Sequence, residues 1–248
     1  MPAFLLVAIL MKTALMQAVP CRGDAAGLIT EAVSRGDAFD LAGAAAAYAT
    51  AERAGCLAAA APAAYLRGLV AAREADAKFG SAASLLPIKL AIESIDRIAA
   101  TDPGARAMQL VLRASIPAAQ HERPEMALLI EEMLRMESLQ LEAKQPPLPV
   151  LSAHEAAGYF WLQLHLYDEA RRAFDAAAQK IGDTPHVLFG TAKAAAGRRD
   201  TRLACTQYQR LLSWWGSRAG SPPEITEARG FVKQPPCVAA PMRLGTRP

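Results

Sequence analysis

The sequence has almost no signal for β-strands. Alternating runs of Val, Ile and Thr between turn residues are missing, and aromatic residues make up only 6% of the 248 residues. Alanine, by contrast, is abundant. It favours closely packed helices because it loses no side-chain entropy in a helix and lets two backbones approach each other. We therefore expect an all-α fold.

Blocks of charge of one sign are also missing. The chain carries 27 basic and 24 acidic residues, a formal net charge of +3, and the two signs are interspersed. A nucleic-acid-binding protein would be expected to show a basic stripe with interleaved aromatic residues. The charge pattern therefore argues against nucleic acid as a partner.

The common motifs of catalysis and metal binding do not occur. There is no Cys-x-x-Cys, His-Glu-x-x-His or Gly-x-Ser-x-Gly sequence, and no glycine-rich phosphate loop or dinucleotide fingerprint. The four histidines, His121, His154, His165 and His186, are scattered without metal-ligand spacing. We expect a protein that is not an enzyme and has no cofactor and no metal. A hydrolase with an unrecognised site is the remaining alternative.

The first twenty residues form an apolar segment interrupted by Lys12. Residues 2–11 carry no charge, and this run is too short to cross a bilayer as a helix. We interpret the segment as a secretory signal with a cleavage point near Ala18, although the usual basic residues before the apolar run are missing. This predicts a periplasmic or secreted protein. A retained membrane anchor, or an apolar first helix of a cytoplasmic protein, are the alternatives.

Gly and Pro residues divide the first half of the chain into short predicted helices. We expect helices at about 24–35, 39–54, 62–78, 86–100 and 124–143. Another helix should begin at 101–103 and end or kink at Pro117. The sequence KQPPLPV at 144–150 is the clearest break.

After this break the pattern repeats at an interval of about 34 residues. In the stretch YDEARRAFDAAA at 167–178, Ala170, Phe174 and Ala177 share one helix face. A shift of 34 residues from these three positions leads to Ala204, Tyr208 and Leu211. The same shift leads from Gly158 and Trp161 to Ala192 and Ala195.

This pattern resembles the tetratricopeptide repeat, a pair of antiparallel helices of about 34 residues. Two units at 151–218 match well, and Ala32, Ala44, Tyr48 and Ala51 give a looser match in the first hairpin. The stretch SPPEITEARGFV resembles the last helix that covers the final repeat in such proteins. The resemblance implies an α-α superhelix that binds a protein or peptide in its concave groove.

The family's groove positions can be carried over to this chain. The resemblance assigns the concave face to Ser152, Glu155, Tyr159, Leu162, His186, Phe189, Lys193 and Ala196. The family members that hold an acidic chaperone C-terminus have Lys and Asn at the positions of Glu155 and Tyr159. We therefore do not expect that ligand here.

The predicted organisation has five parts. They are a signal peptide or apolar segment at 1–20, a degenerate helical-hairpin array at 21–143, a Pro-rich linker at 144–150, two repeats with a capping helix at 151–234, and a flexible tail at 235–248. The expected function is that of a scaffold or adaptor in the bacterial cell envelope, and a cytoplasmic regulatory or structural subunit is the alternative. The partner's identity and the oligomeric state do not follow from the sequence.

The four cysteines fall at the ends of predicted hairpins. Cys21 precedes the first helix and Cys56 follows the second, so an antiparallel pair brings them together. Cys205 and Cys237 are placed in the same way around two later helices. We expect the disulfides Cys21–Cys56 and Cys205–Cys237, as in an oxidising compartment. The alternative is that Cys205 is a small buried residue and the other three are incidental.

Overall fold

The protein is all-helical in the part of the chain that the structure describes. This computed structural model describes residues 21, 23–218, 220–235 and 237, which contain α-helices, one 3-10 helix and no strand. The predicted signal segment at 1–20 and most of the predicted tail at 235–248 lie outside these residues. Within the described residues, no helix combines the length and the apolar character that a membrane span requires. The predicted all-α fold is confirmed.

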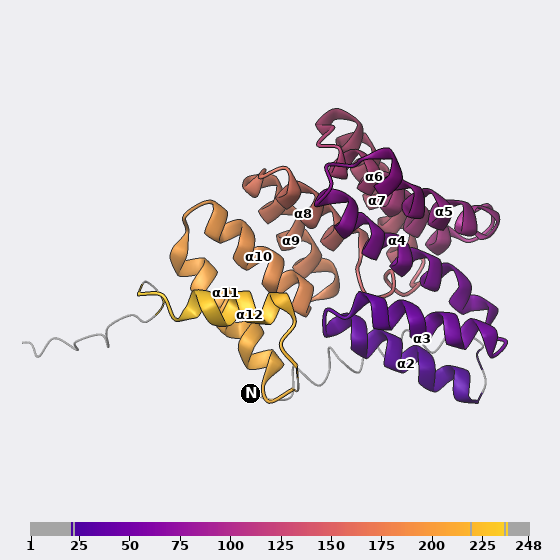
Figure 1. Ribbon diagram of the computed structural model, residues 1–248, viewed down its shortest axis with the longest axis horizontal. Helices are drawn as coiled ribbons and strands as arrows, with labels where there is room; N and C mark the ends of the chain where they lie inside the picture. Colours follow the sequence, from indigo (N-terminus) through magenta and orange to yellow (C-terminus); the bar gives the residue numbers. More distant parts are fainter. Residues whose placement is uncertain (1–20, 22, 219, 236, 238–248) are drawn as a thin grey trace, which may run out of the picture.

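Consecutive helices pack against each other in antiparallel pairs that form an α-α superhelix (Figure 1). The helices are α2 (Asp24–Asp37), α3 (Leu41–Arg53), the 3-10 helix η2 (Leu57–Ala59), α4 (Ala60–Asp76), α5 (Ala82–Ala99), α6 (Pro103–Ala119), α7 (Arg123–Glu142), α8 (Ala153–Gln163), α9 (Tyr167–Ile181), α10 (Pro185–Gly197), α11 (Thr201–Trp215) and α12 (Pro223–Val232).

Two prolines lie inside helices, where the sequence suggested helix ends. The helix α5 begins at Ala82, ahead of its predicted start, so Pro87 is in its second turn. Pro117 was expected to end or kink the preceding helix, but α6 continues beyond it to Ala119. Proline has no backbone N–H, so the carbonyl one turn before Pro87 has no donor within the helix. Pro87 is exposed, and water can donate a hydrogen bond to this carbonyl instead.

Four of the hairpins share one turn geometry. The turns α2–α3, α6–α7, α8–α9 and α10–α11 each have three residues, and the central residue has a positive φ between 56° and 63° (Phe39, His121, His165 and Arg199). In each turn the last residue donates its N–H to the carbonyl five residues earlier, as in a Schellman ending. The hairpin geometry therefore extends to α2–α3 and α6–α7, where the sequence pattern is weak or missing.

The two C-terminal hairpins are joined by the ring of Phe174. This ring is fully buried and lies against Gly158 of α8 and Gly190 of α10. A Cβ atom on either glycine would overlap the ring. The helices α8 and α10 can therefore approach because one ring fills the space between two residues without side chains.

The first hairpin also contacts α10, far away in the sequence. The ring of Phe39 lies 4.7 Å from that of His186 and 5.8 Å from that of Phe189, measured between centroids. The Nε2 atom of His186 is 2.9 Å from the carbonyl oxygen of Gly36. These contacts bring the first hairpin against α10.

The segment 144–150 is packed into the core. Leu148 and Val150 are buried in the same apolar cluster as α2 to α8, and Val150 occupies the space beside Gly36 that a side chain there would fill. The helix α7 ends at Glu142, where Lys144 has a φ of 57° and the Gln145 N–H donates to the carbonyl of Gln140, and Leu148 and Val150 beyond it are buried in the core. The segment thus connects the two halves as part of one core.

Both predicted disulfides are present in the structure. Cys21 and Cys56 join the chain just before α2 to the end of the α3 hairpin, with Cα atoms 5.1 Å apart. Cys205 in α11 is bonded to Cys237 beyond α12, with Cα atoms 5.4 Å apart. The bonded cysteines are 35 and 32 positions apart in the sequence, so each bond closes a loop and constrains the unfolded chain.

Candidate functional site

The concave face of the superhelix holds a groove of about 880 Å³. It is lined mainly by the helices α4, α8, α10 and α12, and by the turns that follow α4, α6 and α8. Its lining side chains include Leu69, Arg73, Asp76, Phe79, His121, Tyr159, Leu162, His165, Tyr167, Phe189, Lys193, Tyr208, Glu224, Glu227 and Phe231. Residues from both ends of the chain thus form one site.

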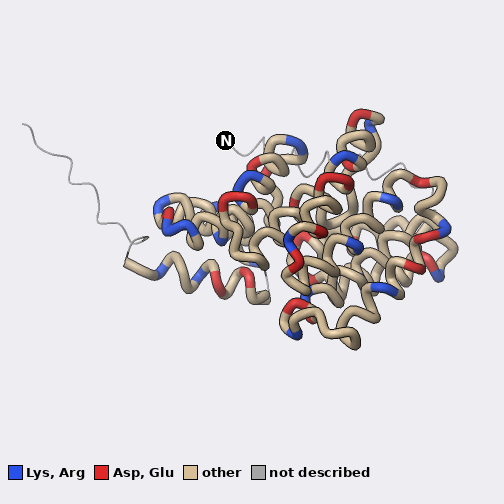
Figure 2. The backbone as a smooth tube through the Cα atoms, turned by 90° about the horizontal axis from the view of Figure 1, so that it is seen from above, with Lys and Arg blue, Asp and Glu red and all other residues tan. Residues whose placement is uncertain are grey.

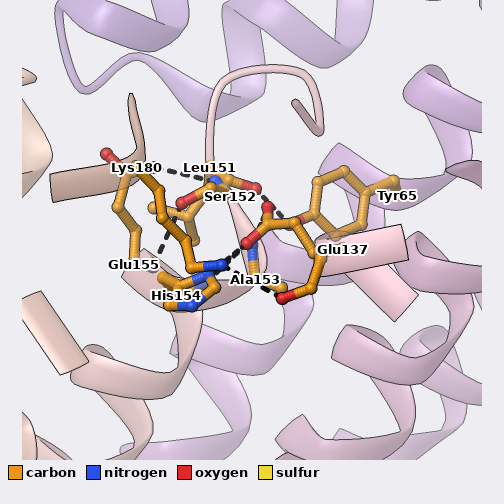
Figure 3. A network of polar contacts seen from close by, with 9 residues as sticks. Tyr65, Glu137, Leu151, Ser152, Ala153, His154, Glu155 and Lys180 are labelled. Atoms are coloured by element: carbon orange, nitrogen blue, oxygen red, sulfur yellow. Dashed lines mark hydrogen bonds and ion pairs between the residues drawn. The ribbon is translucent and has the colours of Figure 1, made fainter. Parts of the chain in front are cut away.

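The helix α8, at the middle of the groove, is fixed at its N-terminus by a buried carboxylate of α7. The side chain of Glu137 accepts hydrogen bonds from the backbone N–H groups of Ala153 (2.8 Å) and His154 (3.2 Å), and it contacts the imidazole Nδ1 of His154 (Figure 3). The Tyr65 hydroxyl donates to the carbonyl of Leu151 (2.7 Å). A negative group at this end also complements the helix dipole.

A second carboxylate, Glu155, joins the starts of α8 and α10. It accepts a hydrogen bond from the backbone N–H of Ser152 (2.7 Å) and one from the hydroxyl of Thr184, the residue that caps α10. The Ser152 hydroxyl accepts in turn from the N–H of Glu155, which completes a capping box. The orientations of Tyr159 and Lys193 in the groove depend on these two fixed helix starts.

One wall of the groove is a row of aromatic rings from α10, α11 and α12. Phe189 and Tyr208 lie 6.2 Å apart, and Tyr208 and Phe231 lie 4.9 Å apart, between centroids. The ammonium of Lys193 is 5.5 Å from the centre of the Phe189 ring. Burial, and then the hydrogen bond to Glu227, raise the pKa of Tyr208 well above its ordinary value, so its hydroxyl stays protonated and donates to that carboxylate (2.7 Å).

Ion pairs connect α12 to the rest of the groove. Arg73 of α4 lies 3.3 Å from Glu224, and Lys193 of α10 lies 3.1 Å from Glu227. The first pair bridges residues 151 positions apart, across the opening between the two ends of the array. The charges of the lining are therefore largely neutralised within the lining itself, and Figure 2 shows basic and acidic residues interspersed over the molecule as a whole.

The groove positions carried over from the repeat family divide into two groups. Tyr159, Leu162, Phe189, Lys193 and Ala196 line the groove. Ser152, Glu155 and His186 are buried and do not line it.

The three buried residues have structural partners instead. Ser152 and Glu155 form the capping box, and the His186 ring packs on Phe39. These three side chains are therefore corrected from groove contacts to core and capping residues.

Sequence reasoning missed the contribution of α4 and of the turns near it. Arg73, Asp76, Phe79 and His121 all line the groove, although none lies in a matched repeat. A partial signal was present, because YLRGLVAA at 65–72 resembles the first helix of a repeat. Continuing that helix by one turn leads to Arg73 and Asp76.

The described residues contain no group of three or more His, Cys, Asp or Glu side chains that could hold a metal ion. The groove instead offers aromatic surface, a few hydrogen-bonding groups and neutralised charges, which suit noncovalent binding.

The chain was compared with protein-family models, with curated proteins and with solved structures, and none of them matches it.

Proposed function

We propose that this chain is a non-enzymatic scaffold of the tetratricopeptide-repeat type that binds a protein or peptide partner in its concave groove. The observation that carries the proposal is the groove itself, which α4, α8, α10 and α12 line with aromatic, aliphatic and charged side chains. Its volume of about 880 Å³ lies in the range of sites that enclose a ligand. The arrangement suits an apolar peptide segment laid into a groove between helices.

Two substitutions in the groove should separate binding from folding. Leu162 and Lys193 line the groove on α8 and α10 and are only partly buried. In the double variant Leu162→Ser, Lys193→Glu we expect at least a tenfold loss of partner binding, because central contacts of a groove carry most of the binding free energy. The measurement is affinity capture from the native envelope fraction, followed by mass spectrometry.

The matched control makes the same changes outside the groove. Leu128→Ser on α7, where 68% of the residue is exposed, and Lys89→Glu on α5 affect residues that do not line the groove. This control should retain the partner, and circular dichroism should give the same helicity for both double variants. Equal capture by the two variants would refute the groove as the binding site.

We further propose that the protein works in an oxidising compartment, the bacterial periplasm or the exterior of the cell. The two disulfides support this, because such bonds persist outside the reducing cytosol. The assignment to a bacterial envelope rests on the resemblance to bacterial repeat proteins.

Thiol titration tests the compartment. Protein isolated from its native source, denatured without reductant, should have none of its four cysteines reactive toward a thiol reagent. After reduction all four should react, and the free energy of unfolding should fall by about 2–4 kcal/mol for each broken disulfide. Four reactive thiols before reduction would favour the cytoplasmic alternative.

A further inference from the structure

The turns that follow α4, α6 and α8, and the first residue of α9, place aromatic side chains together at one edge of the groove. The aromatic rim, as we call it, consists of Phe79, His121, His165 and Tyr167, and all four line the groove. Phe79 and His121 have ring centroids 6.0 Å apart, and the His165 and Tyr167 rings are separated by the same distance. An ion pair of 3.4 Å between Arg123 and Glu169 joins the starts of α7 and α9, so the two halves of the rim lie on neighbouring turns.

The backbone presents these side chains outward at a conformational cost. Phe79 has a φ of 50°, His121 of 60° and His165 of 56°, in the left-handed region that side-chain-bearing residues seldom adopt. Phe79 leaves 79% of its surface exposed, although a large apolar ring gains nothing from water. The left-handed φ of His121 and His165 belongs to the shared hairpin turn, so the exposed ring of Phe79 is the feature that points to a ligand.

One carboxylate at the rim has no Lys or Arg partner. The side chain of Asp76 lines the groove and is 3.7 Å from Nε2 of His121, and no described Lys or Arg lies within salt-bridge distance of it. The other carboxylates of the lining, Glu224 and Glu227, are paired with Arg73 and Lys193.

Several charged residues just outside the rim are paired with each other. Arg123 and Arg172 share Glu169, and Arg198 pairs with Asp168. Among the described carboxylates that line the groove, Asp76 is thus the one without a Lys or Arg partner, and it can interact with a partner's positive charge. The exposed Lys78 on the following turn does not line the groove.

We propose that the aromatic rim and Asp76 bind a lysine or arginine side chain of the partner, next to apolar residues that occupy the groove. This inference rests on the groove being the partner's binding site. Cations are attracted to the faces of Phe and Tyr rings, and a nearby carboxylate adds a charge-assisted hydrogen bond. An acidic partner would instead meet the negative charge of Asp76 and, beyond it, carboxylates that already have partners.

Selection from a random decapeptide library displayed on phage tests the inference on the full, oxidised chain. We expect selected peptides to carry one Lys or Arg at a constant distance from an apolar or aromatic pair. Synthetic copies in which that residue is replaced by norleucine should bind roughly five- to tenfold more weakly, as estimated for an exposed cation–π contact with a salt bridge.

Two variants locate the contact. Asp76→Lys should remove the preference for a basic residue and select peptides with Glu or Asp at the same place. The control Glu131→Lys makes the same charge change at an exposed position of α7 and should leave the preference unchanged. In Phe79→Ala, the peptides with lysine and with norleucine should bind with more nearly equal affinity.

The outcomes distinguish this inference from the proposed function. Selected peptides could fail to bind the double variant Leu162→Ser, Lys193→Glu and yet show no preference for Lys or Arg. This result would contradict the inference about the rim and leave the groove as the binding site. A preference that persists in Asp76→Lys would also overturn it. Failure to select any groove-dependent peptide would contradict the proposed function and the inference together.

Discussion

The Glu137→Ala variant is expected to lose about 3–5 kcal/mol of its free energy of unfolding, because each buried donor left without its acceptor costs about 1–3 kcal/mol. The Glu137 side chain is 0% exposed and accepts hydrogen bonds from the N–H groups of Ala153 and His154. Without the carboxylate, two N–H groups at the start of α8 and the buried imidazole of His154 have no acceptor from α7. Urea unfolding followed by circular dichroism measures the change.

Two further variants of α7 test whether the loss comes from the buried contact. Glu137→Gln keeps one acceptor oxygen and nearly the same shape, so we expect it to be less destabilising than alanine. Glu131→Ala on the same helix removes an exposed carboxylate and should change stability by no more than about 0.5 kcal/mol. If Glu137→Ala lost less than about 1 kcal/mol, α8 would not depend on this carboxylate.

The start of α8 also shows why the groove residues were only partly predicted. The repeat interval holds between the starts of α9 and α11, at Tyr167 and Thr201, but the starts of α8 and α10, at Ala153 and Pro185, are closer together than one repeat. Glu155 is therefore in the first turn of its helix, where side chains cap the N–H groups. Phe189, at the equivalent repeat position, lies further from the start of its helix and lines the groove.

The fold class and the disulfide pairs followed from local signals. Helix starts, the glycine and proline breaks and the Ala-rich faces are properties of short stretches, and antiparallel neighbours bring Cys21 to Cys56 and Cys205 to Cys237. The contribution of α4 to the groove has a different origin. It requires the array to turn back until Arg73 meets Glu224, a contact between distant residues that no local pattern contains.

The packing of the segment 144–150 was likewise not visible in its composition. Proline-rich sequences are typical of linkers, and this expectation placed a boundary between two arrays. Leu148 and Val150 are instead buried in the core cluster of α2 to α8, where Gly36 of the first hairpin leaves room for the Val150 side chain. The groove is therefore built on one continuous core, so a change in that core can affect residues from both halves of the chain.

The second large effect is expected for Phe174→Ala, which should lower the free energy of unfolding by about 3–5 kcal/mol. The ring is 0% exposed, lies between Gly158 and Gly190, and makes an edge-on contact with Tyr159 at 5.2 Å between centroids. Because neither glycine has a side chain that could move into the space, most of the ring's volume should remain as a cavity. Urea unfolding measures the loss, and Phe79→Ala, which removes the same ring from an exposed turn, should cost no more than about 0.5 kcal/mol.

Gly190 provides a sharper test of this packing, because the sign of its effect should depend on residue 174. In the wild-type background, Gly190→Ala places a Cβ atom where the Phe174 ring lies and should destabilise the protein by about 1–3 kcal/mol. In the Phe174→Ala background the same Cβ enters the cavity, and the gain in helix propensity of about 1 kcal/mol is no longer opposed. There we expect Gly190→Ala to be neutral or stabilising. Additive effects of the two substitutions would mean that the ring does not separate α8 from α10.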